Sequence, residues 1–359
     1  MIISGAPSLR ALLLATLLTG ATAHIIAQSP RKVTQLATGV YVIEHRDAQD
    51  GFAGGNTTVI IGERQVLVVD APFLPSEARE DIAQIRQWTS HPVTFLVTTH
   101  FHNDHNFGNR AYMDAFPGLS IIAHPDTKEE MDRFGPGSLS REERGTAGYQ
   151  RLHDSGKNGD GTPLSDADKA EVKRILARRN EVMLEMKKSP FQSATLTVAD
   201  NITIDLGGRN VEVRFLGRGN TPGDLVVQLP AERIVAVGDL VVLPLPYFYD
   251  GYPREWAATL SRVIALQPAM VVPGHGPVLH DTAHLALIRD LITSAVTQMN
   301  EALRNSGPAM FRTVDAVKGS IDLTAFRERF AGGNKEIEAA FDETAAELVR
   351  LVFREASLR

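Results

Sequence analysis

A short run of histidines and a carboxylate constrains this chain more than any other feature. Residues 100–105 read His-Phe-His-Asn-Asp-His, in a chain with 11 histidines among 359 residues. The run follows residues 93–98, Val-Thr-Phe-Leu-Val-Thr, which are typical of a buried strand. Imidazole and carboxylate groups are ligands for borderline divalent metals. The run therefore predicts a metal site in a loop at the end of a strand, and it disfavours a solvated polar loop.

Composition excludes several classes of protein. The length allows two average domains or one large domain with additions. The net charge is only -6 and no dense stripe of Lys and Arg is present, which argues against nucleic acid as a partner. The chain has no cysteine, so it has neither disulfides nor thiolate metal ligands.

The first 23 residues resemble a secretory signal peptide. Arg10 precedes the apolar run at 11–18, and residues 21–23, Ala-Thr-Ala, match the small-residue cleavage pattern. A second candidate cut lies near Ala27. The apolar run is short for a membrane span, which needs about 20 residues. We therefore expect cleavage, no stable membrane anchor afterwards, and a periplasmic or secreted protein.

Strand and helix patterns alternate on both sides of the histidine run, which predicts an α/β fold. Strands are expected at 33–36, 40–43, 57–61 and 65–69, followed by a helix at 76–88 with Ser76 as its N-cap. Strands return between 196 and 237 and at 270–272, with a helix at 253–266. From 281 onward the pattern is helical, with breaks near Gly307 and Gly332.

A charged segment at about 126–190 interrupts this alternation. It contains a strong helical stretch at 165–188 that starts with Ser-Asp-Ala-Asp, so it predicts a helical insertion. Long inserted segments close to a site are often lids. We expect one domain at 24–285 that includes this insertion, and a helical extension at 286–359.

Four further motifs place acidic or histidine residues after apolar strands. They are Asp70, the turn at 217–224, Asp239 and His275 in a Pro-Gly-His-Gly-Pro turn. The carboxyl ends of strands are where α/β proteins gather their sites. The order and spacing of all these motifs resemble the metallo-β-lactamase superfamily, over roughly residues 35–280.

The resemblance implies an αββα four-layer sandwich with a metal site at one edge. It implies that a first metal is held by His100 and His102, and a second by Asp104, His105 and His275. Asp239 would bridge the metals or contact the second. Residues outside the ligand set, expected to orient it, are Asp70, Thr221 and His124.

One position departs from the family pattern. A histidine usually precedes the Thr-x-Gly-Asp turn, but this chain has Asn220 there. An amide oxygen is a weaker ligand for zinc than imidazole. Two outcomes stay open: a dinuclear site in which Asn220 or water fills the gap, or a mononuclear site in which only the second position binds tightly.

Metal-dependent hydrolysis is the function that these features predict. A bound metal lowers the pKa of water to near neutrality and so supplies hydroxide, with Asp104 as ligand and orienting residue. We expect one or two zinc ions, with iron or manganese as alternatives. The expected substrate is a small ester, lactone, thioester or amide.

Three other functions compete with this one. They are β-lactam hydrolysis, non-catalytic metal or partner binding, and iron-dependent sulfur redox chemistry. Residues 240–244 lack the cation that often binds the drug carboxylate in β-lactamases, although Arg218 or Arg254 could substitute. The sequence predicts no oligomeric state. Aromatic residues after Asp239 could be core or a substrate-pocket wall; they are Tyr247, Phe248, Tyr249, Tyr252 and Trp256.

The signal peptide gives a first prediction. N-terminal sequencing of the mature protein from its native host should begin near His24 or Gln28, because cleavage follows the small residues before either position. An intact Met1 would contradict export by this route.

Overall fold

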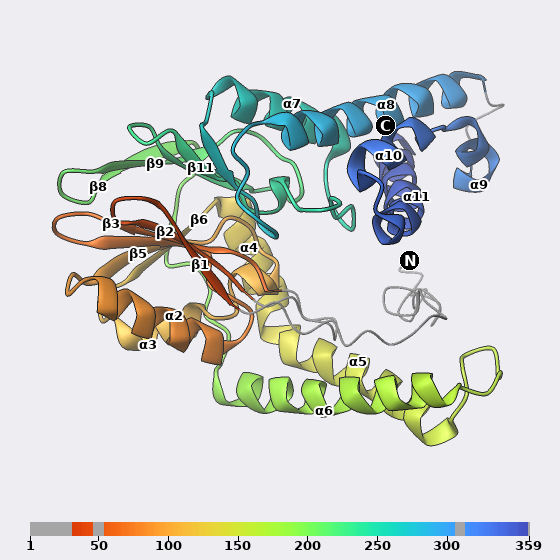
Figure 1. Ribbon diagram of the computed structural model, residues 1–359, viewed down its shortest axis with the longest axis horizontal. Helices are drawn as coiled ribbons and strands as arrows, with labels where there is room; N and C mark the ends of the chain where they lie inside the picture. Colours follow the sequence, from red (N-terminus) through yellow and green to blue (C-terminus); the bar gives the residue numbers. More distant parts are fainter. Residues whose placement is uncertain (1–30, 46–53, 306–312, 358–359) are drawn as a thin grey trace.

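The computed structural model describes residues 31–45, 54–305 and 313–357, and Figure 1 shows these residues arranged in layers. The predicted signal peptide and the break near Gly307 lie outside them. The strands are β1 (Lys32–Ala37), β2 (Val40–Glu44), β3 (Thr57–Ile61), β4 (Val66–Val69), β5 (Val93–Val97), β6 (Ser120–Ala123), β7 (Leu196–Thr197), β8 (Asn201–Asp205), β9 (Asn210–Phe215), β10 (Leu225–Leu229), β11 (Ile234–Ala236) and β12 (Met270–Val272). The α-helices are α2 (Pro75–Trp88), α3 (Asn109–Ala115), α4 (Pro125–Phe134), α5 (Ser138–Ser155), α6 (Asp166–Lys188), α7 (Pro253–Ala265), α8 (Ala283–Asn305), α9 (Val314–Val317), α10 (Thr324–Ala331) and α11 (Lys335–Ser357).

The described strands form two sheets. The first has the order β1-β2-β3-β4-β5-β6-β7, antiparallel as far as β4 and parallel from β4 to β7. The second has the order β12-β11-β10-β9-β8, in which only β11 and β12 are parallel. Apolar side chains of both sheets, such as Val42 and Val227, share one buried cluster, so the sheets pack face to face.

Helices cover the outer face of each sheet. The first sheet packs against α2 and α3 through a cluster that includes Ile82 and Tyr112. The second packs against α7, α8 and α11 through another cluster, which includes Trp256 and Leu291. Figure 1 shows the resulting order of helix, sheet, sheet and helix. The predicted αββα sandwich is confirmed.

The N-cap predicted for α2 is wrong, whereas the start predicted for α6 is confirmed. α2 begins at Pro75 after Leu74, because proline's fixed φ suits the first helical position. Ser76 lies inside the helix, and its backbone N–H donates to Glu185. α6 begins with a capping box in which the Ser165 hydroxyl accepts from the Asp168 N–H and the Asp168 carboxylate accepts from the Ser165 N–H.

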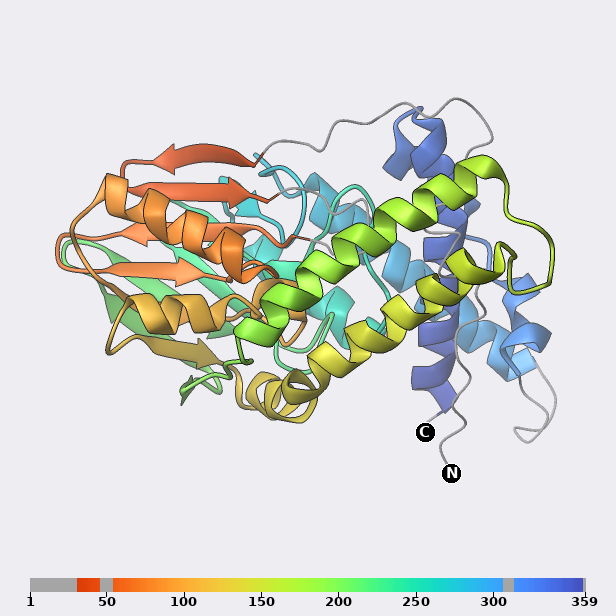
Figure 2. The same cartoon turned by 90° about the horizontal axis from the view of Figure 1, so that it is seen from below.

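The inserted segment contains α4, α5 and α6. Figure 2 shows α5 and α6 side by side as a long arm. The arm has its own apolar cluster, which includes Leu152 and Ile175. At its base, the Asn103 side chain is hydrogen-bonded to the Ser138 hydroxyl at 3.0 Å, so the arm is joined to the loop of the histidine run.

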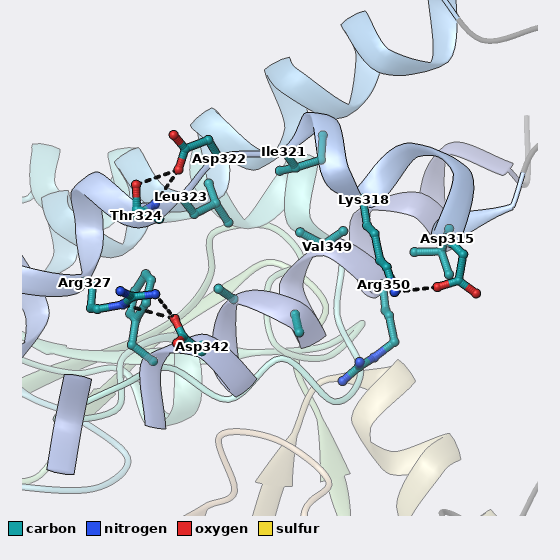
Figure 3. A pocket seen from close by; sticks show the side chains of 14 residues that line it. Asp315, Lys318, Ile321, Asp322, Leu323, Thr324, Arg327, Asp342, Val349 and Arg350 are labelled. Atoms are coloured by element: carbon teal, nitrogen blue, oxygen red, sulfur yellow. Dashed lines mark hydrogen bonds and ion pairs between the residues drawn. The ribbon is translucent and has the colours of Figure 1, made fainter. Parts of the chain in front are cut away.

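The helices after residue 313 enclose a hollow of about 350 Å³ between α9, α10 and α11. Its rim carries the ion pairs Lys318–Asp315 and Arg327–Asp342 (Figure 3). None of the histidines of the candidate site lines it, so it is separate from the site described below. Within the described ranges, no helix is long and apolar enough to cross a membrane.

Candidate metal centre

Four loops bring Asp70 and the predicted metal ligands to one edge of the sandwich. Asp70 directly follows β4, and the histidine run follows β5 through a short 3-10 helix, η1 (Asn103–His105). Asp239 follows β11 within η3 (Gly238–Leu240), and His275 follows β12. The carboxyl ends of these strands meet at one edge, because β4–β5 and β11–β12 are both parallel pairs.

One group of ligand atoms converges around the Nε2 atom of His105. This nitrogen lies 3.2 Å from His275 Nε2, 3.2 Å from Asp239 Oδ1 and 3.5 Å from Asp104 Oδ2. His275 Nε2 lies 3.0 Å from Asp104 Oδ2. These four side chains offer ligand atoms that all lie within 4.8 Å of one another. Two imidazoles and two carboxylates are a ligand set that fits zinc.

A second group shares Asp239 with the first. His100 Nε2 lies 3.0 Å from His102 Nδ1 and 3.7 Å from Asp239 Oδ2. The two oxygens of Asp239 therefore face different groups, with Oδ1 toward His105 and Oδ2 toward His100. A carboxylate in this position can bridge two metal ions.

Asp70 determines which ring nitrogens remain available as ligands. Its Oδ2 accepts from His105 Nδ1 at 3.0 Å, which leaves the His105 Nε2 lone pair for a metal. The same oxygen accepts the Thr99 hydroxyl proton at 2.8 Å. That hydroxyl can then only accept from His100 Nδ1, 3.0 Å away, which leaves His100 Nε2 free as a ligand. One carboxylate thus orients a histidine in each group.

Burial and charge set the protonation of the ligands. Burial lowers the pKa of His100 well below 6.5, and burial also lowers the pKa of His102, so both rings are neutral. Burial alone would lower the pKa of His105, but the carboxylates of Asp239 and Asp104 outweigh it and raise that pKa well above 6.5. Without a metal, a proton is therefore held where lone pairs converge, and a metal must displace it.

The residues present fit a bound cation. Asp239 Oδ1 is buried, and its nearest polar neighbours are the ring nitrogens His105 Nε2 and His275 Nε2, at 3.2 and 3.5 Å. A buried carboxylate oxygen is costly without positive charge beside it, which protonated His105 supplies when no metal is bound and a metal ion would supply in its place. The types of donor atom also fit a divalent metal, since they are imidazole nitrogens and carboxylate oxygens and include no thiolate.

Asn220 lies in a tightly held turn. The buried Asp224 carboxylate accepts from the backbone N–H groups of Gly219 and Thr221 at 3.0 and 2.9 Å, and from the Thr221 hydroxyl at 2.9 Å. Burial raises the pKa of Asp224 to about 7. The Asn220 side chain is buried, and its amide nitrogen lacks a hydrogen-bond partner in the part of the chain described. Whether it ligates stays a prediction.

The other outer residues hold structure around the ligands. Thr221 stabilises the turn through Asp224. His124 Nδ1 accepts from the Asp126 N–H and so caps α4, while its ring stacks on Phe215 at 4.2 Å between centroids. An effect of Thr221 and His124 on metal binding stays a prediction.

Comparison with known proteins places this geometry in a family. A model of the metallo-beta-lactamase superfamily matches residues 50–275, which include every candidate ligand. The chain belongs to the metallo-beta-lactamase superfamily. A linear primary-alkylsulfatase from Pseudomonas sp. is 24% identical over 229 residues, covering 59% of this chain and 39% of that protein. A type 2 metallo-beta-lactamase from Bacillus cereus is 31% identical over 98 residues, covering 26% of this chain and 38% of that enzyme.

Solved metallo-beta-lactamase structures share the fold. The enzyme from Pontibacter korlensis matches with a TM-score of 0.52 at 20% identity, over 73% of this chain and 99% of that one. TMB-1 matches with a TM-score of 0.51 at 17% identity, over 74% and 98%. The chain spans about two-fifths of the length of the alkylsulfatase and of the Bacillus cereus enzyme named above.

Two residues that the sequence analysis missed also position the ligands. The Asn56 side chain donates to the carbonyls of Pro273 and Gly276 at 3.0 and 2.8 Å, and so fixes the loop of His275. A Cβ at Gly55 would lie 2.4 Å from the His105 ring, so only glycine leaves room there. Neither residue has a sequence signal, because its partner is far away in the chain.

The departure at Asn220 gives a prediction for metal stoichiometry. Zinc titration of the metal-free protein should show one tight equivalent and one weaker one, because the group of His105 has four strong ligands and the group of His100 has three. Asn220→His should tighten the weaker equivalent by adding an imidazole. His275→Ala should abolish the tight one. Two equally tight equivalents in the unmutated protein would refute this asymmetry.

Gly274 gives a second prediction. A Cβ there would lie 1.9 Å from Asp239 Oδ1, while the Gly274 N–H is fixed by bonds to the carbonyls of Gly238 and Val241. Gly274→Ala should therefore displace Asp239 and reduce bound zinc at both positions, measured by elemental analysis. Gly319→Ala is the matched control, since no heavy atom lies within 4 Å of its added Cβ. Full zinc content in Gly274→Ala would show that Asp239 is not shared.

Proposed function

We propose that this protein is a metal-dependent hydrolase of ester substrates, and that sulfuric esters of alcohols are its first candidate substrate class. The observation that carries the proposal is the pair of ligand groups joined by Asp239. The centre is accessible on the side of Asp104, whose side chain is 20% exposed, whereas Asp239, which belongs to both groups, is 3% exposed. A substrate can therefore approach beside Asp104.

The choice of a sulfuric ester rests on the extent of similarity. The alkylsulfatase match covers 229 residues, against 98 for the Bacillus cereus β-lactamase. At 24% identity this likeness supports sulfuric esters as a class, and it does not support one particular alkyl sulfate. A carboxylic ester, lactone, thioester or amide requires the same kind of nucleophile, so these are the next classes to assay.

The reaction needs only water as co-reactant. A metal held by these ligands lowers the pKa of water and stabilises negative charge that develops on the substrate. The oxygen of water bonds to sulfur, or to carbon in a carboxylic ester. The bond from that atom to the alcohol oxygen breaks, and a proton from water ends on that oxygen. Asp104 is a partly exposed carboxylate of the ligand set, and its neighbours His105 and His275 keep its pKa well below 3.8 against the effect of burial. It therefore stays ionised and can accept a hydrogen bond that orients the attacking water.

β-Lactam hydrolysis is a second candidate, favoured by the similarity to the Bacillus cereus enzyme. The residues at the positions that could bind a drug carboxylate argue against β-lactam hydrolysis. Leu240, Val241 and Val242 are buried and apolar. Arg218 is hydrogen-bonded to Glu255, and Arg254 donates to Asn300, so both arginines already have partners.

We also propose zinc as the metal and export as the fate of the chain. Imidazole and carboxylate ligands without thiolate suit zinc, although iron uses similar ligands. Metal analysis of protein from the native host distinguishes them. Iron would favour the sulfur redox alternative, and zinc would favour hydrolysis.

A panel of substrates tests the proposed function. Zinc-loaded protein should release sulfate from a primary alkyl sulfate, and a chelator should abolish the release. Asp104→Asn should lower kcat by roughly 10² or more, because a catalytic group contributes about 10²–10⁴-fold. Asp114→Asn, an exposed carboxylate in α3, is the control.

Three results would redirect the proposal. Hydrolysis of phenyl acetate or a cephalosporin without sulfate release would change the substrate class. Sulfate release that survives complete chelation would refute the metal centre. No turnover of any of the three substrates by zinc-loaded protein would favour a non-catalytic metal-binding role.

A further inference from the structure

A hollow of about 310 Å³ adjoins the metal centre, within the size range of small-molecule sites. Two of its residues are chain neighbours of the site: Phe101 lies between His100 and His102, and Thr221 follows Asn220. The hollow is lined by Phe101, Glu130, Arg133, Phe134, Thr221, Pro222, Asp250, Gly251, Tyr252, Arg354 and Glu355. We call it the α4–α11 hollow.

Aromatic rings form its wall on the side of the metal centre. The Phe101 ring packs edge-on against His102, with centroids 4.7 Å apart. Phe134 of α4 stacks on Phe101 at 5.9 Å. Tyr252 and Pro222 contribute from the loops after β11 and β9. Phe134 is 37% exposed, and the Arg133 guanidinium lies over its ring, 4.9 Å from the centroid, so part of the ring is open at the rim of the hollow.

Each charged residue of the hollow has a partner of opposite charge. Arg133 pairs with Glu130 at 3.8 Å and Arg354 pairs with Asp250 at 3.8 Å. The third carboxylate, Glu355, lies 3.7 Å from the guanidinium of Arg254, which is just outside the lining. The rim therefore has no uncompensated charge that would select an anion or a cation, and the stems of the arginines add apolar surface.

The C-terminal helix α11 supplies one wall of the hollow. Arg354 and Glu355 belong to α11, and the stretch shared with the family ends at residue 275. A smaller hollow of about 250 Å³ continues from Arg354 along α11, lined by Phe248, Tyr249, Leu351 and others. Tyr249 is 64% exposed at this position. The wall along α11 therefore comes from outside the residues that the family model matches.

We infer that the α4–α11 hollow binds the uncharged, apolar organic group of the substrate while the ester group lies at the metal centre. This inference rests on the proposed function for the ester group, but the hollow itself can be tested without turnover. Phe134 and Arg354 are specificity-determining residues, since they line the hollow and lie outside the ligand set.

Binding of 1-alkanols from ethanol to octanol to zinc-loaded protein tests the inference by calorimetry. Each added methylene should tighten binding by about fourfold until the hollow is filled, because each buries apolar surface. Phe134→Ala and Arg354→Ala should reduce the gain in affinity per methylene to about twofold for the longer alkanols. Leu184→Ala is the matched control, because Leu184 is 57% exposed on α6 and does not line the hollow. Zinc content and the unfolding temperature of each variant show that it is folded.

Two further probes make the result decisive. Glu130→Trp should fill part of the hollow and remove the gain from the longer chains while ethanol binding is unchanged. Hydroxyalkanoates of equal length, which carry a terminal carboxylate, should bind to the metal-free protein at least tenfold more weakly than the alkanols. Tighter binding of the hydroxyalkanoates to the metal-free protein would overturn the inference, because with no zinc to bind the carboxylate the arginines would be recruiting it. The inference would also be overturned if alkanol affinity did not increase with chain length. It would be overturned as well if Phe134→Ala and Arg354→Ala left that increase unchanged.

The two proposals fail separately. Chain-length-dependent binding of alkanols without hydrolysis of alkyl sulfates would refute the ester class and support the hollow. Hydrolysis of alkyl sulfates with a rate that is independent of chain length would support the proposed function and refute the hollow.

Discussion

The site depends on the contacts of the Asp239 carboxylate with both groups of histidines. This carboxylate is buried, and its two oxygens face different histidine groups, with Oδ1 3.2 Å from His105 Nε2 and Oδ2 3.7 Å from His100 Nε2. A buried charge in this state is stable only beside a cation. The backbone around it is shaped to admit it: Gly238 has a φ of 51°, and a side chain at Gly274 would overlap the carboxylate. The edge of the sandwich is therefore built around a charge that a metal would neutralise.

Asp70 extends this dependence to both ligand groups. It has a φ of 60°, which is unusual for a residue other than glycine, and this conformation directs its side chain into three hydrogen bonds with Thr99 and His105. Through the Thr99 hydroxyl it also fixes the tautomer of His100. Ligands on two sides of the centre thus share one outer carboxylate, and their ring nitrogens are oriented together and not independently.

The inserted arm and the C-terminal helix α11 connect the metal centre to other parts of the chain. The inserted arm is anchored to the histidine loop through Asn103 and Ser138. α11 shares the apolar core of the second sheet and also reaches the α4–α11 hollow through Arg354. In the proposed role of the hollow, substrate selection depends on walls that come from segments that the family match only partly includes.

The sequence by itself predicted an α/β class, because strand and helix periodicity are local properties of the chain. Its motif order resembled a family, and that resemblance implied the αββα sandwich and the residues that meet at the site. The sequence predicted the start of α6 from a local capping box but placed the cap of α2 wrongly, since proline geometry at Pro75 competed with the side chain of Ser76. Only the tertiary structure decided that Asp239 faces both groups, that Asn56 holds the loop of His275 across 217 residues, and that α11 borders the cleft. These are contacts between segments distant in sequence, and no local pattern encodes which side chains meet when the sheets and helices pack.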